Sequence, residues 1–80
     1  MEILTGRKVP VTERAIVQRL NRRLAHDYES IKTPRGERNL QSLGRFYLLN
    51  TYQNWIMKTH IDPESFARDL GVMAPWEVVI

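Results

Sequence analysis

Residues 12–24 read TERAIVQRLNRRL, a stretch that predicts the first helix and the layout of the fold around it. Apolar residues recur at helical spacing in this stretch and just beyond it, and form one stripe: Ile16, Val17, Leu20, Leu24 and Tyr28. Thr12 is a good N-cap, because its hydroxyl can accept a backbone N–H that has no partner within the helix. Asp27 and Glu29 are unfavourable near a helix C-terminus. We therefore expect the helix to end within residues 25–27.

A second helix is expected to begin after Asp62, whose side chain can cap it, with Pro63 in its first turn. Gly71 provides the left-handed residue that commonly ends a helix. The buried face of this helix is expected to consist of Phe66, Ala67 and Leu70. Residues 73–80 are apolar apart from one glutamate, so we expect this tail to dock on the core.

Between the two helices, residues 28–33, 46–49 and 55–61 are rich in strand formers. The last two segments are joined by the polar loop 50–54, which has hairpin length. In the third segment the apolar Trp55, Met57 and Ile61 alternate with Lys58 and His60, a pattern typical of a half-buried strand. Residues 37–44 fit either a short helical turn or an irregular strand.

The predicted order is helix, two or three antiparallel strands, helix (α-β-β-β-α), which is an α+β fold with two layers. Eighty residues make one small domain, residues 1–80. Ahead of the first helix, Ile3 and Leu4 can form a short strand. Pro10 is expected to interrupt any regular structure there.

The net charge of +3 is unevenly distributed. Residues 1–60 hold eleven of the twelve lysines and arginines but five of the nine acidic residues, which gives +6, whereas residues 61–80 carry −3. The chain has no cysteine, no signal-peptide-like N-terminus and no apolar run of membrane-spanning length. These features predict a cytoplasmic protein without disulfides and without a membrane partner.

The cations are mostly arginine, which suits two-pronged contacts with phosphate or carboxylate. Seven are candidate binding residues for a polyanion: Arg14, Arg19, Arg22, Arg23, Arg35, Arg38 and Arg45. If the loop after the first strand folds next to the first helix, these residues form one patch; otherwise they are ordinary solvated surface. Tyr47, Tyr52 and Trp55 can add stacking surfaces, although aromatics at sheet spacing more often serve core or cross-strand packing. Tyr52 and Trp76 are candidate interface aromatics.

No catalytic set is apparent in the sequence. His60 and Asp62 have the spacing of a base and its orienting carboxylate, but Asp62 is expected to serve as a helix cap and no serine nucleophile stands beside the pair. His60, Asp62 and Glu64 are the only cluster of metal-ligand types, and no glycine-rich phosphate loop is present. We therefore expect no enzymatic activity, no cofactor, no metal and no small-molecule substrate.

Three resemblances bear on function. The element order is similar to a double-stranded-RNA-binding domain, but Asp62-Pro63-Glu64-Ser65 is acidic where that family has a lysine-rich helix start. Residues 66–72, FARDLGV, resemble the first helix and turn of a bacterial helix-turn-helix, whose recognition helix would then have to fit within residues 73–80.

The third resemblance extends from Val11 onward. It combines the arginine-rich first helix with four short motifs: Gly44-Arg45-Phe46-Tyr47, Ile61-Asp62-Pro63-Glu64, Leu70-Gly71-Val72 and Pro75-Trp76-Glu77. In this combination the chain resembles short uncharacterised proteins of proteobacterial plasmids, integrative elements and prophages. The resemblance implies an accessory role in a mobile element.

The sequence thus predicts a small non-enzymatic binding protein that engages nucleic acid or a nucleoprotein through its arginine-rich face. The alternative is an anti-CRISPR-like inhibitor that binds and blocks a host defence protein complex. A homodimer formed through the apolar tail, residues 73–80, is compatible with either function.

Overall fold

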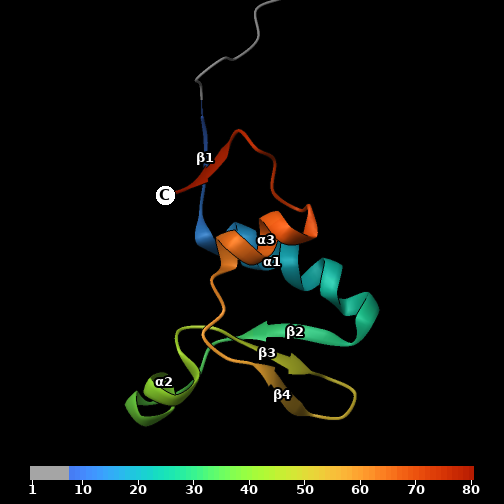
Figure 1. Ribbon diagram of the computed structural model, residues 1–80, viewed down its shortest axis with the longest axis vertical. Helices are drawn as coiled ribbons and strands as arrows, with labels where there is room; N and C mark the ends of the chain where they lie inside the picture. Colours follow the sequence, from blue (N-terminus) through green and yellow to red (C-terminus); the bar gives the residue numbers. More distant parts are fainter. Residues whose placement is uncertain (1–7) are drawn as a thin grey trace, which may run out of the picture.

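The computed structural model describes residues 8–80 and has an α+β architecture (Figure 1). Its elements in chain order are β1 (Val9–Val11), α1 (Glu13–Leu24), the 3-10 turn η1 (Ala25–Asp27), β2 (Glu29–Lys32), α2 (Glu37–Leu43), β3 (Tyr47–Asn50), β4 (Trp55–Lys58), α3 (Pro63–Leu70) and β5 (Glu77–Val79). Strands β2, β3 and β4 form an antiparallel sheet in that order, and β1 pairs with β5 in a separate parallel ribbon. The predicted α+β class and the helix-strands-helix order are confirmed. The expected strand at residues 3–4 lies outside the described residues.

The core lies between the two longer helices and the inner face of the sheet. Helices α1 and α3 lie on the same side of the β2–β3–β4 sheet, and α3 packs against α1 (Figure 1). The buried apolar residues come from α1, the sheet and the residue before β3, α3 and the segment after α3: Ile16, Leu20, Leu24, Ile31, Phe46, Leu48, Ala67 and Met73. Phe66 and Leu70 pack against this cluster, so the predicted buried face of the second helix is confirmed.

Helix α1 starts where its sequence predicts and ends at Leu24, one residue before the predicted range 25–27, which forms the 3-10 turn η1. The Thr12 hydroxyl accepts a hydrogen bond from the Ala15 N–H at 3.1 Å, and the helix gives way to η1 after Leu24. The apolar stripe, however, does not reach Tyr28. This residue adopts a left-handed conformation, with φ of 58°, which turns the chain into β2 and leaves the ring exposed. The stripe depends on the period of an α-helix, and α1 has already ended at Leu24, four residues before Tyr28.

The expectation that Pro10 interrupts regular structure is wrong, because Pro10 is the middle residue of β1. The Val9 N–H donates to the Trp76 carbonyl at 2.8 Å and the Ile80 N–H donates to the Val11 carbonyl at 2.9 Å. The backbone of Pro10 therefore faces away from β5, where its missing N–H costs no ladder hydrogen bond. The tail docks as predicted, with Met73 buried and residues 77–79 forming β5.

Strand β4 is not the half-buried strand that its alternation predicts, since all four of its residues are exposed. It is an outer strand of the sheet, and α1 packs against β2 at the opposite edge. The β3–β4 register shifts between Leu48 and Leu49, so a bulge also breaks the alternation. The predicted hairpin is confirmed, with its loop at residues 51–54, because Asn50 is the last residue of β3.

Residues 37–43, which fitted either a helical turn or a strand, form helix α2 between two glycines of positive φ, Gly36 and Gly44. Helix α3 ends at Gly71 as predicted, with φ of 75° and the Val72 N–H bonded to the Ala67 carbonyl at 3.0 Å. Asp62 occupies the N-cap position, but its carboxylate accepts no capping hydrogen bond. The prediction that its side chain caps the helix is therefore wrong. No helix among residues 8–80 has the length and apolar character needed to cross a membrane.

Candidate binding surfaces

Helix α1 presents a row of polar side chains to solvent. Arg14, Gln18 and Arg22 follow one another at intervals of four residues, and all three are exposed. At 1.5 Å of rise per residue the two arginines lie about 12 Å apart along the helix axis. Within residues 8–80 neither arginine forms an ion pair with an acidic side chain. We call these three residues the α1 row.

Arg19, on the same helix, is half-buried and is bonded to the C-terminal tail. Its guanidinium donates two hydrogen bonds to the Glu77 carboxylate, at 2.8 and 2.9 Å, and a third to the Val72 carbonyl at 3.2 Å. The Ala74 N–H also donates to this carboxylate, at 2.8 Å. These bonds, led by that from Arg19, lower the pKa of Glu77 to about 2, and the Glu77 contact raises the pKa of Arg19. Arg19 thus holds the tail onto α1.

Arg23 and Arg45 are exposed but each has an acidic neighbour. The Arg23 guanidinium lies 3.4 Å from the Asp27 carboxylate, one helical turn further on. Arg45 pairs with Glu13 at the start of α1 and lies over the Phe46 ring, 5.1 Å from its centroid. Glu13 therefore offsets the charge of Arg45.

Arg35 precedes α2 and Arg38 lies within it. Both are exposed, and neither forms an ion pair within the described part of the chain. Figure 1 shows α2 at the far side of the sheet from the C-terminal half of α1. The seven predicted arginines therefore do not merge into one patch. Of the three that follow α1 in the sequence, only Arg45 contacts that helix, through Glu13.

Aromatic side chains gather at the end of the sheet that carries the β3–β4 hairpin. Tyr52 is 79% exposed and Tyr28 63%; their rings are tilted, with centroids 5.8 Å apart. The Thr51 N–H donates to the Tyr28 carbonyl at 2.7 Å, which fixes the two segments to one another. Trp55 and Trp76 are also exposed, Trp76 at the other end of the molecule beside β5. Tyr52 and Trp55 are thus not core residues, although Tyr52 does pack against another aromatic ring, that of Tyr28. Sequence reasoning missed Tyr28 as a surface aromatic because it placed that ring in the helical stripe.

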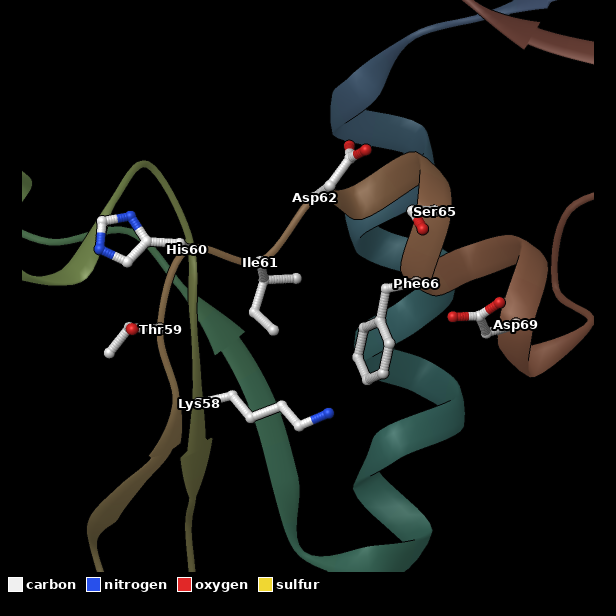
Figure 2. Close-up of a pocket in the computed structure, with 8 residues that line it drawn as sticks. All are labelled: Lys58, Thr59, His60, Ile61, Asp62, Ser65, Phe66 and Asp69. Atoms are coloured by element: carbon white, nitrogen blue, oxygen red, sulfur yellow. The ribbon is translucent and has the colours of Figure 1, made fainter.

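An open hollow of about 320 Å³ lies between the end of β4 and α3 (Figure 2). Its charged and titratable groups have mixed signs: Lys58, His60, Asp62 and Asp69. Figure 2 shows the His60 imidazole and the Asp62 carboxylate directed away from one another, so they do not form a base and its orienting carboxylate. The hollow therefore presents no single charge to a ligand.

His60 has a packing role. It adopts a left-handed conformation (φ 55°), and its N–H donates to the Leu43 carbonyl at 2.8 Å. A Cβ atom on Gly44 would lie 2.6 Å from His60 Nδ1. The close approach of His60 to Gly44 fixes the end of α2 against the chain that leaves β4.

Across residues 8–80, no three His, Asp or Glu side chains come close enough together to hold a metal ion. Comparison of the chain with protein-family models, curated proteins and solved structures finds no match. Functional argument therefore depends on the surfaces described above.

Proposed function

We propose that this chain is a small non-enzymatic binding protein that engages nucleic acid, alone or within a nucleoprotein, through the exposed arginines of α1. The observation that carries the proposal is the α1 row, in which Arg14 and Arg22 lie on one line of a helix with only the neutral Gln18 between them. Arg23 adjoins the row, and its contact with Asp27 is an exposed pair of the kind that contributes little.

The surroundings of the row support a polyanion rather than a single carboxylate. Two nearby acidic side chains are already engaged by other arginines, Glu13 by Arg45 and Glu77 by Arg19. Consequently they do not oppose an approaching phosphate chain at the row. Phosphate contacts of this kind give affinity without sequence preference, and the affinity falls as salt rises.

Titration of short DNA and RNA oligonucleotides tests the proposal. If three arginines contact phosphates, the logarithm of the binding constant falls with the logarithm of salt concentration with a slope of about −2 to −3. This slope corresponds to a loss of affinity of about 10- to 20-fold between roughly 50 and 150 mM salt. An absence of binding at low salt, or binding that salt does not weaken, contradicts the proposal.

Two double variants of equal charge locate the surface. Arg14→Gln with Arg22→Gln is expected to reduce the salt slope by between about 1 and 2 and to weaken binding to all sequences alike. Arg35→Gln with Arg38→Gln removes the same charge near α2 and is expected to have a smaller effect. Equal losses for both variants would mean that net charge, not the α1 row, attracts the nucleic acid.

A second candidate function is the inhibition of a host defence protein complex, with the chain carried by a mobile element. The exposure of Tyr52 and Trp76 favours it, because exposed aromatic side chains are the common anchors of protein interfaces. The test is a pull-down from nuclease-treated host lysate with the wild type and with Tyr52→Ala and Trp76→Ala. Retention of a defined complex by the wild type, and its loss with either variant, would support this function over nucleic-acid binding. Both candidate functions assume a protein that acts inside the cell.

A further inference from the structure

The C-terminal end of α1 lies on the same side of the molecule as the β3–β4 hairpin (Figure 1). His26 follows Arg22 at the interval of four residues that defines the α1 row, and it is also exposed. Tyr28 comes directly after η1, and its ring lies beside that of Tyr52 on the hairpin, with centroids 5.8 Å apart. The α1 row therefore leads along the helix towards two tyrosines, Tyr28 and Tyr52, which we call the aromatic pair.

Tyr28 carries an aromatic ring at a backbone position that favours glycine. Its φ of 58° lies in the left-handed region, where a bulky residue is an outlier. Burial does not account for the ring, because the residue is 63% exposed. The backbone is nevertheless fixed, since the Tyr28 N–H donates to the Ala25 carbonyl at 3.2 Å and the Tyr28 carbonyl accepts from the Thr51 N–H at 2.7 Å. Backbone outliers of this kind are concentrated at functional sites.

Tyr52 is held by the loop to which it belongs. The Asn50 carbonyl accepts from the Asn54 N–H at 2.7 Å, and Asn50 Oδ1 accepts from the Gln53 N–H at 2.7 Å. The rings of the aromatic pair are tilted by 54° rather than parallel, and Tyr52 is 79% exposed, so most of its surface remains open. Exposed rings on a backbone that is already fixed lose little conformational freedom when a flat group stacks on them.

The charges around the aromatic pair favour a neutral group there rather than a phosphate. Asp27 and Glu29 flank Tyr28 in the sequence, and a carboxylate repels a phosphate. Arg23 engages Asp27 at 3.4 Å. The arginines of the α1 row, which form no ion pair within the described residues, lie further back along the helix. The surface thus has one part suited to phosphates and an adjoining part suited to flat neutral rings.

We propose that the nucleic acid at the α1 row is single-stranded, and that its unpaired bases stack on Tyr28 and Tyr52 while its phosphates contact the row. In a duplex the faces of the bases are covered by stacking, so a side-chain ring meets only phosphates and sugars along most of its length. A single strand can turn its bases to aromatic rings and keep its phosphates at cationic side chains. This assignment rests on the proposed function and adds to it the class of nucleic acid.

The dimensions of the surface agree with a short single strand. Helix α1 rises about 12 Å from Arg14 to Arg22, and the chain rises about 9 Å further to Asp27, the residue before Tyr28. This span of about 21 Å corresponds to roughly six nucleotides at the spacing of a stacked strand, about 3.4 Å. Site sizes of about 4–16 nucleotides are usual for single-strand binding. One strand can therefore contact the row and the aromatic pair together.

Fluorescence anisotropy of the full chain at about 50 mM salt tests the proposal with labelled probes of about 12 nucleotides. The probes are a deoxythymidine strand, a uridine strand, a blunt DNA duplex, and an abasic DNA strand that keeps the phosphates and lacks the bases. The tighter of the deoxythymidine and uridine strands is expected to bind at least about fivefold more tightly than the abasic strand, the gain from one stacked base. It is also expected to bind more tightly than the duplex. The comparison of these two strands shows whether DNA or RNA supplies the bases.

Variants of the aromatic pair locate the stacking surface. Tyr52→Ala is expected to weaken binding of the preferred strand at least about fivefold and to leave the abasic strand unaffected. Tyr52→Phe restores the ring and is expected to restore the affinity. Tyr28→Gly removes the other ring at a φ that glycine favours, so this variant is expected to stay folded and to weaken the same strand. Circular dichroism verifies the fold of each variant.

Leu40→Ala is the matched control, because Leu40 is an exposed apolar residue, at 46% exposure, on α2, away from the hairpin (Figure 1). It is expected to bind every probe like the wild type. In NMR spectra the ring protons of Tyr28 and Tyr52 are expected to shift with the preferred strand but not with the abasic strand.

Several results would overturn the proposal. If the wild type binds the abasic strand or the duplex as tightly as the preferred strand, and salt weakens all of them, stacking is contradicted and the proposed function stands. Unchanged affinity in both Tyr52→Ala and Tyr28→Gly, or an equal loss on the abasic strand, has the same meaning. If no probe binds at about 50 mM salt, the proposed function fails and the single-strand assignment fails with it.

Discussion

Arg19 and Glu77, fifty-eight residues apart, face one another through two parallel hydrogen bonds of 2.8 and 2.9 Å. The Glu77 side chain is only 12% exposed, and the Ala74 N–H and the Arg19 guanidinium together satisfy it. This pair joins the tail to the first helix and therefore couples the ribbon to the core. The charge state of Glu77 therefore contributes to the response of the fold to acid.

The Arg19–Glu77 pair predicts a loss of stability in acid. The pKa of Glu77 is about 2 in the folded chain against an ordinary value of 4.5. The carboxylate therefore stabilises the fold fully above pH 4.5, and this contribution is lost as the pH falls through about 2. Glu77→Gln is expected to lower the urea midpoint at pH 7 and to flatten its dependence on pH between 5 and 2.

Glu64→Gln is the control for this titration, since it removes a carboxylate from an exposed pair with Arg68. It is expected to keep the pH response of the wild type. If Glu77→Gln follows the same pH curve as the wild type, the Arg19–Glu77 pair does not contribute to acid stability.

Asn21→Ala is expected to expose the edge of β2. The Ile31 N–H donates to Asn21 Oδ1 at 2.6 Å and loses this acceptor in the variant. The loss costs about 1–3 kcal/mol in the free energy of unfolding. Gln18→Ala, an exposed change on the same helix, is expected to stay within about 0.5 kcal/mol of the wild type. Urea unfolding measures both, and amide exchange at Ile31 is expected to accelerate in Asn21→Ala alone. Unchanged exchange would show that the side chain of Asn21 does not protect this edge.

Gly44→Ala is expected to destabilise the fold more than Gly36→Ala. Both glycines have positive φ, 77° and 84°, in a backbone region that costs a side chain about 1–3 kcal/mol. Only at Gly44 would the added Cβ clash, at 2.6 Å from His60 Nδ1 and 2.8 Å from His60 Cα, whereas Gly36 has open space. Thermal unfolding of the two variants compares them directly. Equal melting temperatures would contradict the close packing of His60 on Gly44.

Thr12→Ala and Asp62→Ala compare a cap that is bonded with one that is not. Thr12 accepts the Ala15 N–H, so its loss is expected to cost about 0.5–2 kcal/mol. Asp62 makes no capping hydrogen bond, so Asp62→Ala is expected to change stability by less than about 0.5 kcal/mol. A larger loss for Asp62→Ala would show that its carboxylate does cap α3 in solution.

The elements that sequence reasoning placed correctly have local signals. Thr12 begins α1, Gly71 ends α3, and the polar loop 50–54 makes a hairpin, because each depends on residues only a few positions apart. The errors concern relations between distant segments. Alternation in β4 predicted a buried face, but burial depends on what covers a strand, and α1 packs against the other edge of the sheet.

The candidate surface could be predicted only in part for the same reason. Helical spacing identifies Arg14 and Arg22 as polar-face residues, and both are exposed. The same spacing groups Arg19 with them, although its partner Glu77 comes from the far end of the sequence. A helical pattern tells which way a side chain leaves its helix, but not which distant residue meets it.

The pairing of β1 with β5 has a consequence for how the fold is completed during synthesis. Val9 of β1 lies opposite Glu77 of β5. The ribosome therefore adds sixty-eight further residues after Val9 before its partner has been synthesised. At the usual rate of translation this takes roughly 3–14 s. During that time β1 and the guanidinium of Arg19 lack the partners that they have in the native structure. The β1–β5 ribbon and the Arg19–Glu77 pair can therefore form only after residue 77 has been added to the chain.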